Sequence, residues 1–396
     1  MTGTDALLAC AAAFGVAALT TPLAAVLASR VGAVDQPRAR GLSERPTPLL
    51  GGLAMLAAVL LAGLIWLPWD SETRAILIAA VVISLVGAID DAVELPAFVK
   101  LLGQTAAAII PVSAGVKVNN ITLPFAGAVD FGWVGVPLTV IGLVALMNVV
   151  NFSDGIDGLA AGVCAIGAVA FSVIAFDLDR AAAGVLAAIV AGAAAGFLVH
   201  NFPPAKVFMG DSGANLLGLL LGCVAVQGTL KTNAVVAVVL PLLILAAPLL
   251  DTGFVVAKRL RYGRPVHVAD QNHFHHRLAR VGMSPRRTVA YLYGWTFSLA
   301  TLAVAIRFVP YTDDLGQFRP GWTLVLILLG VVALAASIQV VAVLEIMGFR
   351  KLRARQMRDA SPGSSDSDID AEVSREIQTG EWDAVRPGQS DELGAP

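Results

Sequence analysis

The amino-acid sequence predicts an all-α polytopic membrane protein with about eleven transmembrane helices. Of the 396 residues, 57% are hydrophobic and only 14% are charged, and the mean hydropathy is +0.77. These values lie outside the usual range of soluble domains. Long apolar runs recur along the chain, and basic residues are concentrated in alternate connections between them. Composition, run length and charge alternation therefore all indicate a bundle of helices in a lipid bilayer.

Each apolar run is close to the roughly 20 residues that a spanning helix needs. The runs are rich in glycine and alanine, which is typical of helices that pack closely in lipid. The first run is too long for a signal-peptide core and lacks a basic flank, so we expect it to remain as the first span. The expected helix centres are Ala17, Ala58, Ala80, Ala107, Gly142, Gly167, Ala191, Leu220, Leu242, Leu299 and Val332.

The connections form two alternating sets, and 21 of the 27 lysines and arginines fall in one of them, counting Lys100 at the start of the helix that follows residues 90–95. The positive-inside rule makes that side cytoplasmic, which puts the N-terminus outside and the C-terminus inside. The polar motifs described below all fall on this side. The basic set comprises residues 30–47, 90–95, 151–157, 200–211 and 257–287 and the tail after 348.

Two parts of different composition are expected. Residues 1–350 form the integral membrane domain, and residues 351–396 form a cytoplasmic tail that is first basic and then acidic. From Asp359 the tail is rich in Ser, Asp, Glu, Gly and Pro, which predicts disorder. The three cysteines lie within apolar runs and have neither metal-ligand nor disulfide spacing, so we interpret them as small buried residues.

The most informative stretch is 148–160, Asn-Val-Val-Asn-Phe-Ser-Asp-Gly-Ile-Asp-Gly-Leu-Ala, which lies between two apolar runs. Polar residues at a membrane boundary are costly unless they have partners or a function. Asp154 and Asp157 are three positions apart, so one helical turn would place both on one face. The pattern favours a metal and phosphate site at the membrane surface, and the alternative is a polar loop between helices.

A second motif contains the adjacent carboxylates of Asp90 and Asp91, followed by Lys100. Neighbouring carboxylates repel each other unless they share a cation or a proton, so Mg²⁺ or a substrate proton would stabilise the pair. Lys100 begins the next apolar run, where it could meet a phosphate. The alternative interpretation is that the pair caps a helix N-terminus, which explains one carboxylate better than two adjacent ones.

Two further connections carry groups suited to phosphates and bases. The first basic loop is stiffened by prolines and contains Arg45, a residue type that suits phosphate recognition, although ordinary positive-inside loops look the same. Asp211 lies between glycines at an expected helix N-terminus, where its carboxylate could hold a metal that bridges to phosphate oxygens. Phe208 precedes it and would either stack on a base or pack against other side chains.

Four of the five histidines lie between 267 and 276. A zinc site is a poor interpretation because no cysteine is near and His273, His275 and His276 do not share one helical face. Binding of an anionic phosphate by these imidazoles and Arg277 fits the composition at least as well, and a general-acid role stays open.

Taken together, the motifs resemble those of the polyprenyl-phosphate N-acetylhexosamine-1-phosphate transferases over about residues 1–350. In that family a polyprenyl phosphate attacks the β-phosphorus of a UDP-sugar and releases UMP. The resemblance implies that Asp211 and Asn151 bind Mg²⁺, with Mn²⁺ as an alternative ion. It also implies catalytic roles for Asp90 and Asp91, which orient or deprotonate the lipid phosphate, and a place in the site for Asp154. The implied substrate-binding residues are Arg45, Lys100, Asp157, Phe208, His273, His275, His276 and Arg277.

The histidine motif is most similar to the GlcNAc-1-phosphate branch, which implies UDP-GlcNAc as the donor and undecaprenyl or decaprenyl phosphate as the acceptor. UDP-GalNAc and UDP-MurNAc-pentapeptide stay open as donors, as does formation of a homodimer. We expect the lipid bilayer to be a partner and nucleic acid not to be one. An ion-coupled transporter is the alternative from another class, although transporters place ionisable residues near the bilayer midplane rather than at span ends.

Overall fold

The computed structural model describes most of the chain as helices. The described residues are 1–36, 46–123, 127–228, 239–246, 248–250, 252–253, 256, 284–313, 317–360 and 365–379. The helices of the bundle are α1 (Gly3–Val31), α2 (Gly51–Trp66), α3 (Ser71–Val93), α4 (Ala97–Ser113), α5 (Gly135–Ser153), α6 (Leu159–Asp177), α7 (Ala181–Asn201), α8 (Gly210–Gly228), α9 (Leu240–Ile244) and α12 (Pro285–Phe308). The remaining elements are α13 (Pro320–Ala360), α14 (Asp366–Thr379), the 3₁₀ helix η1 (Gly132–Val134) and the strands β1 (Val34–Asp35), β2 (Thr47–Pro48), β3 (Asn120–Leu123) and β4 (Gly127–Asp130).

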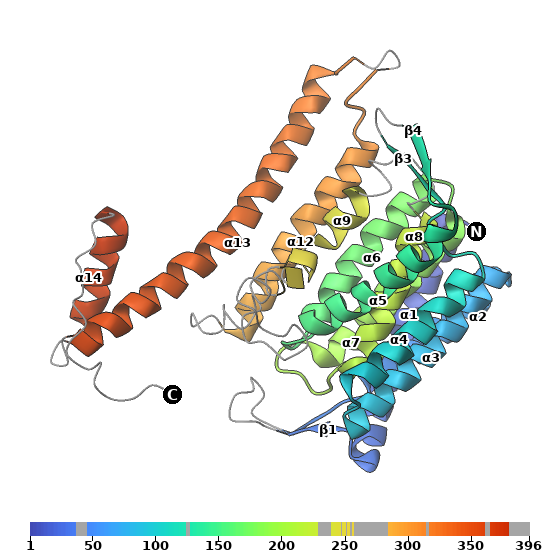
Figure 1. The fold of residues 1–396 in the computed structure, drawn as a ribbon, viewed down its shortest axis with the longest axis horizontal. Coiled ribbons are helices and arrows are strands. Elements are labelled where there is room, and N and C mark those ends of the chain that lie inside the picture. Colours follow the sequence, from blue (N-terminus) through green and yellow to red (C-terminus); the bar gives the residue numbers. More distant parts are fainter. Residues whose placement is uncertain are drawn as a thin grey trace.

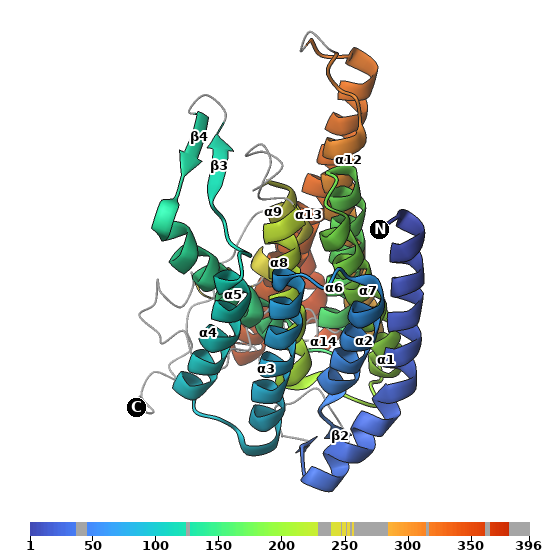
Figure 2. The ribbon, with the colours of Figure 1, turned by 90° about the vertical axis from the view of Figure 1, so that its right-hand side faces the viewer.

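The helices run side by side, and their connections gather at two opposite ends (Figures 1 and 2). One end, at the bottom of both views, carries the β1–β2 pair and the α3–α4, α5–α6 and α7–α8 connections. The other end carries the N-terminus and the antiparallel β3–β4 hairpin. For the connections that the structure describes, these ends match the two alternating sets expected from the sequence. We call the end with the α3–α4 connection the site end.

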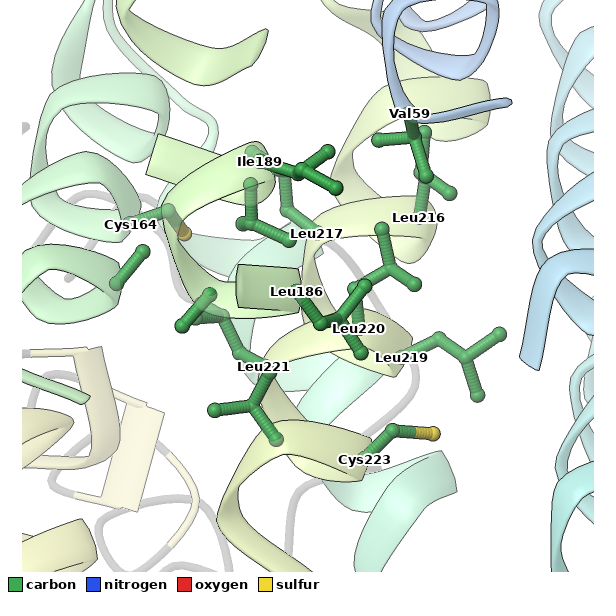
Figure 3. Close-up of a cluster of buried hydrophobic side chains, with 14 of the residues drawn as sticks. Val59, Cys164, Leu186, Ile189, Leu216, Leu217, Leu219, Leu220, Leu221 and Cys223 are labelled. Carbon is green, nitrogen blue, oxygen red and sulfur yellow. The ribbon is translucent and has the colours of Figure 1, made fainter. Parts of the chain in front are cut away.

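Helix α8 is the central helix of the bundle. Its residues from Ser212 to Val226 are all buried, and it packs against α2, α3, α5, α6 and α7. Figure 3 shows its leucines, from Leu216 to Leu221, among side chains of α2, α6 and α7. A helix that is apolar on every side is expected inside a bundle rather than on its surface. The first turn of α8 is therefore held at the site end by the whole core.

Close packing between α5 and α8 depends on a glycine. A Cβ atom added at Gly218 would lie 2.6 Å from the Cα atom of Met147 and 2.8 Å from the carbonyl oxygen of Leu146. No side chain fits at that separation, so the two backbones meet directly, as is usual for small residues between membrane helices. This contact brings the last turn of α5 next to the first turn of α8.

Each expected helix centre falls within a helix of the structure, and the all-α polytopic class is confirmed. Within the described residues, seven helices are long and apolar enough to cross a membrane, fewer than the eleven runs expected. Helices α2 and α4 have only 16 and 17 residues, about 24 to 26 Å at 1.5 Å per residue. They are shorter than the roughly 30 Å hydrocarbon core and pack within the bundle among longer helices.

The described part of the tail is helical, although its composition predicts disorder from Asp359, and the division of the chain at residue 350 stays a prediction. Helix α13 continues to Ala360, and α14 forms a further helix that packs against α13. Two signals favour helix here despite the polar composition. The hydroxyl of Ser365 accepts a hydrogen bond from the Asp368 backbone N–H, which caps the helix, and Ile369 and Val373 are four positions apart and both buried.

Candidate active site

Four helices bring charged and amide side chains together at the site end. Asp90 and Asp91 lie in the last turn of α3, and Lys100 lies in the first turn of α4. Asn151 lies in the last turn of α5, and Asp211 is the second residue of α8. These residues are far apart in the sequence, so only the packing of the bundle makes them neighbours.

Lys100 connects two of the carboxylates. Its Nζ atom lies 3.2 Å from Oδ2 of Asp90 and also forms an ion pair with Oδ2 of Asp211. The side chains of Lys100 and Asp211 are each 21% exposed, so the ion pair is only partly screened by solvent. Within the part of the chain that the structure describes, the Oδ2 atom of Asp211 accepts no hydrogen bond besides this ion pair. Lys100 is therefore the cation that pairs with this oxygen there.

Asn151 holds the other oxygen of the same carboxylate. Its Nδ2 atom donates a hydrogen bond to Oδ1 of Asp211 over 2.7 Å. This bond joins α5 to α8 and fixes the plane of the Asp211 carboxylate. Carboxylate and amide carbonyl oxygens are the ligand types that Mg²⁺ prefers. The two residues that the sequence predicts as metal ligands are thus brought into direct contact.

Asp91 caps the N-terminus of α8 from outside that helix. Its Oδ1 atom accepts the backbone N–H of Asp211 at 2.7 Å, and its Oδ2 atom accepts that of Ser212 at 3.2 Å. Gly210 makes this possible, since its φ is +68° and a Cβ there would lie 2.4 Å from the Asp91 carboxylate. A carboxylate at a helix N-terminus is favourable because it satisfies N–H groups that have no partner in the helix and interacts with the helix dipole.

The two adjacent carboxylates therefore have different partners, although the sequence suggested one shared cation. Asp90 accepts the backbone N–H of Leu95 at 2.7 Å and pairs with Lys100, whereas Asp91 contacts the α8 backbone. Neighbouring residues on an α-helix point about 100° apart, which separates their contacts. The interpretation that uses one carboxylate as a helix cap fits Asp91, and the cation contact belongs to Asp90.

The segment that contains Asp154 and Asp157 is not helical. Helix α5 ends at Ser153, and α6 begins at Leu159 after Gly158, which has a φ of +77°. The expected common helical face is therefore wrong, because the glycine-containing segment turns the chain. Burial, together with the nearby charges of Asp91 and Asp157, raises the pKa of Asp154 to about 7. Burial also raises the pKa of Asp157, although its hydrogen bond with Ala205 opposes this.

Asp157 positions the connection between α7 and α8. Its Oδ2 atom accepts the backbone N–H of Ala205 at 2.8 Å. Nearby, the buried amide of Asn201 accepts the N–H of Gly158 and donates to the carbonyl oxygen of Val207, each over 2.9 Å. These bonds fix the segment that precedes Phe208, whose side chain is half-buried. Asp157 thus has a structural contact in addition to the base-binding role implied by resemblance.

The sequence did not predict a layer of amides that lies one helical turn deeper. Gln104 of α4 and Asn215 of α8 are each only 1% exposed, and both belong to one hydrogen-bonded set with Asn148 of α5. The signal available in the sequence was a lone glutamine within the apolar run of α4.

Five of the expected substrate-binding residues lie outside the described residues. They are Arg45, His273, His275, His276 and Arg277. Their roles stay predictions from the sequence. The described residues contain no group of three or more His, Cys, Asp or Glu side chains arranged to hold a metal ion.

Comparisons with known proteins match this chain to one family. The model of glycosyl transferase family 4 matches residues 73–229, which span α3 to α8 and contain all the described site residues. A probable undecaprenyl-phosphate N-acetylglucosaminyl 1-phosphate transferase of Bacillus subtilis is 37% identical over 72% of this chain and 81% of its own. A decaprenyl-phosphate N-acetylglucosaminephosphotransferase of Mycobacterium leprae is 38% identical over 73% and 80%.

A more distant relative carries a different name. A phospho-N-acetylmuramoyl-pentapeptide-transferase of Halalkalibacterium halodurans is 30% identical over 66% of this chain and 82% of its own. The family model includes the helices that build the described site, and each of these relatives is matched over about four fifths of its own length. The chain therefore belongs to glycosyl transferase family 4, together with the polyprenyl-phosphate N-acetylhexosamine-1-phosphate transferases.

Proposed function

We propose that this protein transfers GlcNAc-1-phosphate from UDP-GlcNAc to a membrane polyprenyl phosphate, with Mg²⁺ as cofactor. The products are polyprenyl-pyrophosphoryl-GlcNAc and UMP, and the reaction would begin the synthesis of a cell-envelope polysaccharide or an arabinogalactan linker. The observation that carries the proposal is the convergence of Asp90, Lys100, Asn151 and Asp211 at one end of the bundle. The names of the relatives at 37% and 38% identity favour GlcNAc over other sugars.

The reaction exchanges one phosphoryl bond for another. An oxygen of the polyprenyl phosphate attacks the β-phosphorus of the UDP-sugar and forms a new pyrophosphate bond. The bond between that phosphorus and the oxygen bridging to the α-phosphorus breaks, and UMP leaves with the electron pair. Catalysis of such a transfer rests mainly on positioning and on neutralising phosphate charge. Since a phosphate monoester is largely dianionic at pH 7, no strong base is needed.

The contacts at the site end suggest how the residues divide this work. Lys100 presents an ammonium group that can pair with a phosphate oxygen when the substrates displace one of its carboxylate partners. The first N–H groups of α8 are already occupied by Asp91, so the helix N-terminus itself does not offer them to a phosphate. Asp90 is then the carboxylate best placed to orient Lys100.

The donor set at Asp211 fits Mg²⁺. One carboxylate oxygen of Asp211 pairs with Lys100, and the amide of Asn151 donates to the other. Mg²⁺ usually takes one or two protein oxygens and completes its shell with water and substrate phosphates, which agrees with the small number of ligands here. When bound, the ion would neutralise negative charge on the phosphate oxygens. Mn²⁺ has similar ligand preferences and is the alternative.

We further propose that the site end faces the cytoplasm, where UDP-sugars are available, and that the N-terminus lies outside. The concentration of lysine and arginine in the connections of this end supports the orientation. The polyprenyl phosphate would keep its chain in the bilayer while its phosphate reaches the site from the membrane surface. Undecaprenyl and decaprenyl phosphates fit equally well, and a homodimer stays a prediction.

The decisive experiment is UMP release by the purified protein in detergent with Mg²⁺ and polyprenyl phosphate. UDP-GlcNAc, UDP-GalNAc and UDP-MurNAc-pentapeptide are compared as donors, with EDTA as the metal-free control. We expect UMP from UDP-GlcNAc only, and no UMP with EDTA. UMP release from another donor would support the proposed reaction and assign a different sugar to it. No release from any donor, with intact protein and several lipid lengths, would favour the transporter.

A further inference from the structure

A layer of three buried amides lies directly behind the charged site. Gln104 Nε2 donates to Oδ1 of Asn215 over 2.8 Å, and Asn148 Nδ2 donates to Oε1 of Gln104 over 2.9 Å. Asn215 in turn donates to the backbone carbonyl of Asp211 over 2.8 Å. The hydrogen bonds thus run in one direction from α5 through α4 to the first turn of α8. We call Gln104, Asn148 and Asn215 the amide layer.

The orientation of each amide is fixed by its neighbours. Asn148 Nδ2 also donates to the carbonyl oxygen of Val144 at 2.8 Å, and Asn215 Nδ2 donates to that of Asp211. Backbone carbonyls can only accept, so both asparagines must present their nitrogen to the backbone. Gln104 is then left with one arrangement, in which it accepts from Asn148 and donates to Asn215. An ionised carboxylate at this position could accept from Asn148 but could not donate to Asn215.

Each amide shares a helix face with one residue of the site. Gln104 is four positions after Lys100 on α4, and Asn215 is four positions after Asp211 on α8. Asn148 is three positions before Asn151 on α5. Residues three or four apart are neighbours on a helix surface. The amide layer therefore fixes the rotation and height of the three helices that carry the proposed phosphate-binding and metal-binding groups.

The unfavourable free energy of burying three amides supports a role for the layer beyond packing. Burying an amide without partners is unfavourable, and most positions on these helices are apolar. Helix α4 packs mainly against α3 and α5 and has few contacts with α8. Its hydrogen bond from Gln104 to Asn215 therefore gives α4 a defined position relative to Asp211 that apolar side chains would not specify.

We propose that the amide layer acts as a set of positioning residues that holds Lys100, Asn151 and Asp211 in register for metal and diphosphate binding. The proposal rests on the proposed function, since it assigns metal binding to Asp211 and Asn151. Partners behind metal ligands typically affect metal affinity or activity by about 10- to 100-fold when they are removed. Loss of Gln104 would break the layer at its central member.

The test compares Gln104→Leu with Gln227→Leu. Gln227 is a matched control because it lies on α8 at the opposite end, where its Nε2 donates to Oε2 of Glu72 over 2.7 Å. Mn²⁺ binding is measured by electron paramagnetic resonance without substrates, and UMP release is measured against UDP-GlcNAc concentration. Thermal unfolding midpoints of both variants are recorded in the same detergent.

For Gln104→Leu we expect Mn²⁺ to bind about tenfold more weakly and the KM for UDP-GlcNAc to rise. Gln227→Leu should lower the unfolding midpoint by a similar amount while Mn²⁺ affinity stays within about twofold of the wild type. Equal effects of the two variants on Mn²⁺ affinity would overturn the proposal, as would unchanged affinity in Gln104→Leu.

A second variant covers the case in which Gln104→Leu does not fold. Gln104→Glu keeps the shape, and its protonated form retains one donor and one acceptor. We expect its Mn²⁺ affinity, relative to the wild type at the same pH, to recover as the pH is lowered. A constant ratio at all pH values would contradict the role of the hydrogen bonds. If the wild type itself neither binds Mn²⁺ nor releases UMP, the proposed function fails instead of this inference.

Discussion

Helices α3 and α8 pack against each other and carry polar contacts at both ends, but the two ends differ in charge. At the far end, one carboxylate, Glu72, accepts a hydrogen bond from one neutral amide, Gln227. At the site end, Lys100 forms ion pairs with both Asp90 and Asp211, and Asp91 accepts backbone N–H groups of α8. Holding two membrane helices together needs only the kind of contact found at the far end. The charged contacts of the site end are therefore where we expect the proposed cation to bind.

The first and largest test of this comparison is Asp211→Asn. The substitution keeps the size of the side chain and removes its charge, so turnover should fall by at least about 10²- to 10³-fold, the usual effect of losing one electrostatic contact to the transition state. UMP release is the measurement, and the unfolding midpoint checks that the fold survives. Glu72→Gln is the control from the far end and should stay within about twofold of wild-type turnover. Near-normal activity of this variant would show that Asp211 is not the metal ligand.

Substitutions of Asp91 separate a helix cap from a catalytic base. Asp91→Asn keeps one acceptor for the α8 N–H groups, whereas Asp91→Ala keeps none. Loss of a cap costs about 1 kcal/mol of stability, so the free energy of unfolding should fall more in Asp91→Ala. Because the cap also positions Asp211, kcat should fall more in Asp91→Ala than in Asp91→Asn. If the two variants were equally inactive while Asp91→Asn kept wild-type stability, the charge of Asp91 would be the essential feature.

The pKa of Asp154 at the site end predicts a pH dependence of stability. Since its folded-state pKa is about 7, above the usual value of 3.8, the folded protein holds a proton that the unfolded chain releases between these values. Stability should therefore fall as the pH rises from about 4 to about 7. Thermal unfolding in EDTA, where no divalent cation contributes, should show this slope in the wild type and a shallower slope in Asp154→Asn, because burial also raises the pKa of Asp157. An unchanged slope in the variant would assign the effect to another group.

The smallest expected effect is that of Gln227→Leu on activity. This variant breaks the far-end contact with Glu72, so the free energy of unfolding should fall by about 1 kcal/mol. Turnover at saturating UDP-GlcNAc should stay within about twofold of the wild type, because no site residue is near. A loss of turnover as large as that of the Asp91 variants would show that the two ends of α3 and α8 are coupled. The far-end contact would then not be purely structural.

Much of the fold could be predicted because it depends on patterns local in the sequence. Long apolar runs must form helices in lipid, where every backbone polar group needs an internal partner. The helix centres and the two sets of connections followed from those runs. The tail was harder, since the cap at Ser365 and the Ile369–Val373 pair are weak signals within a polar, acidic segment. Its composition predicted disorder, whereas its local pattern favours a helix.

The residue types of the site could also be predicted, because carboxylates, a lone lysine and amides at span ends are costly unless they have partners. The contacts that each of these residues makes could not be predicted from the sequence. Whether Asp91 contacts a cation or the backbone of α8 depends on a residue 120 positions away and on Gly210. Likewise, nothing in the sequence near Gln104 shows that it meets Asn215, which lies on a helix 111 positions later.

The amino-acid sequence was sufficient to predict a helical membrane protein of one family and to place Asp90, Lys100, Asn151 and Asp211 at one end of it. Hydrophobicity and residue spacing are properties of neighbouring residues, so they can be read along the chain. The packed structure was needed to show which carboxylate caps α8, which carboxylates pair with Lys100, and which amides lie behind Asp211. Those contacts arise from the packing of α3, α4, α5 and α8 against one another, and contact distances between separate helices are set by the whole core.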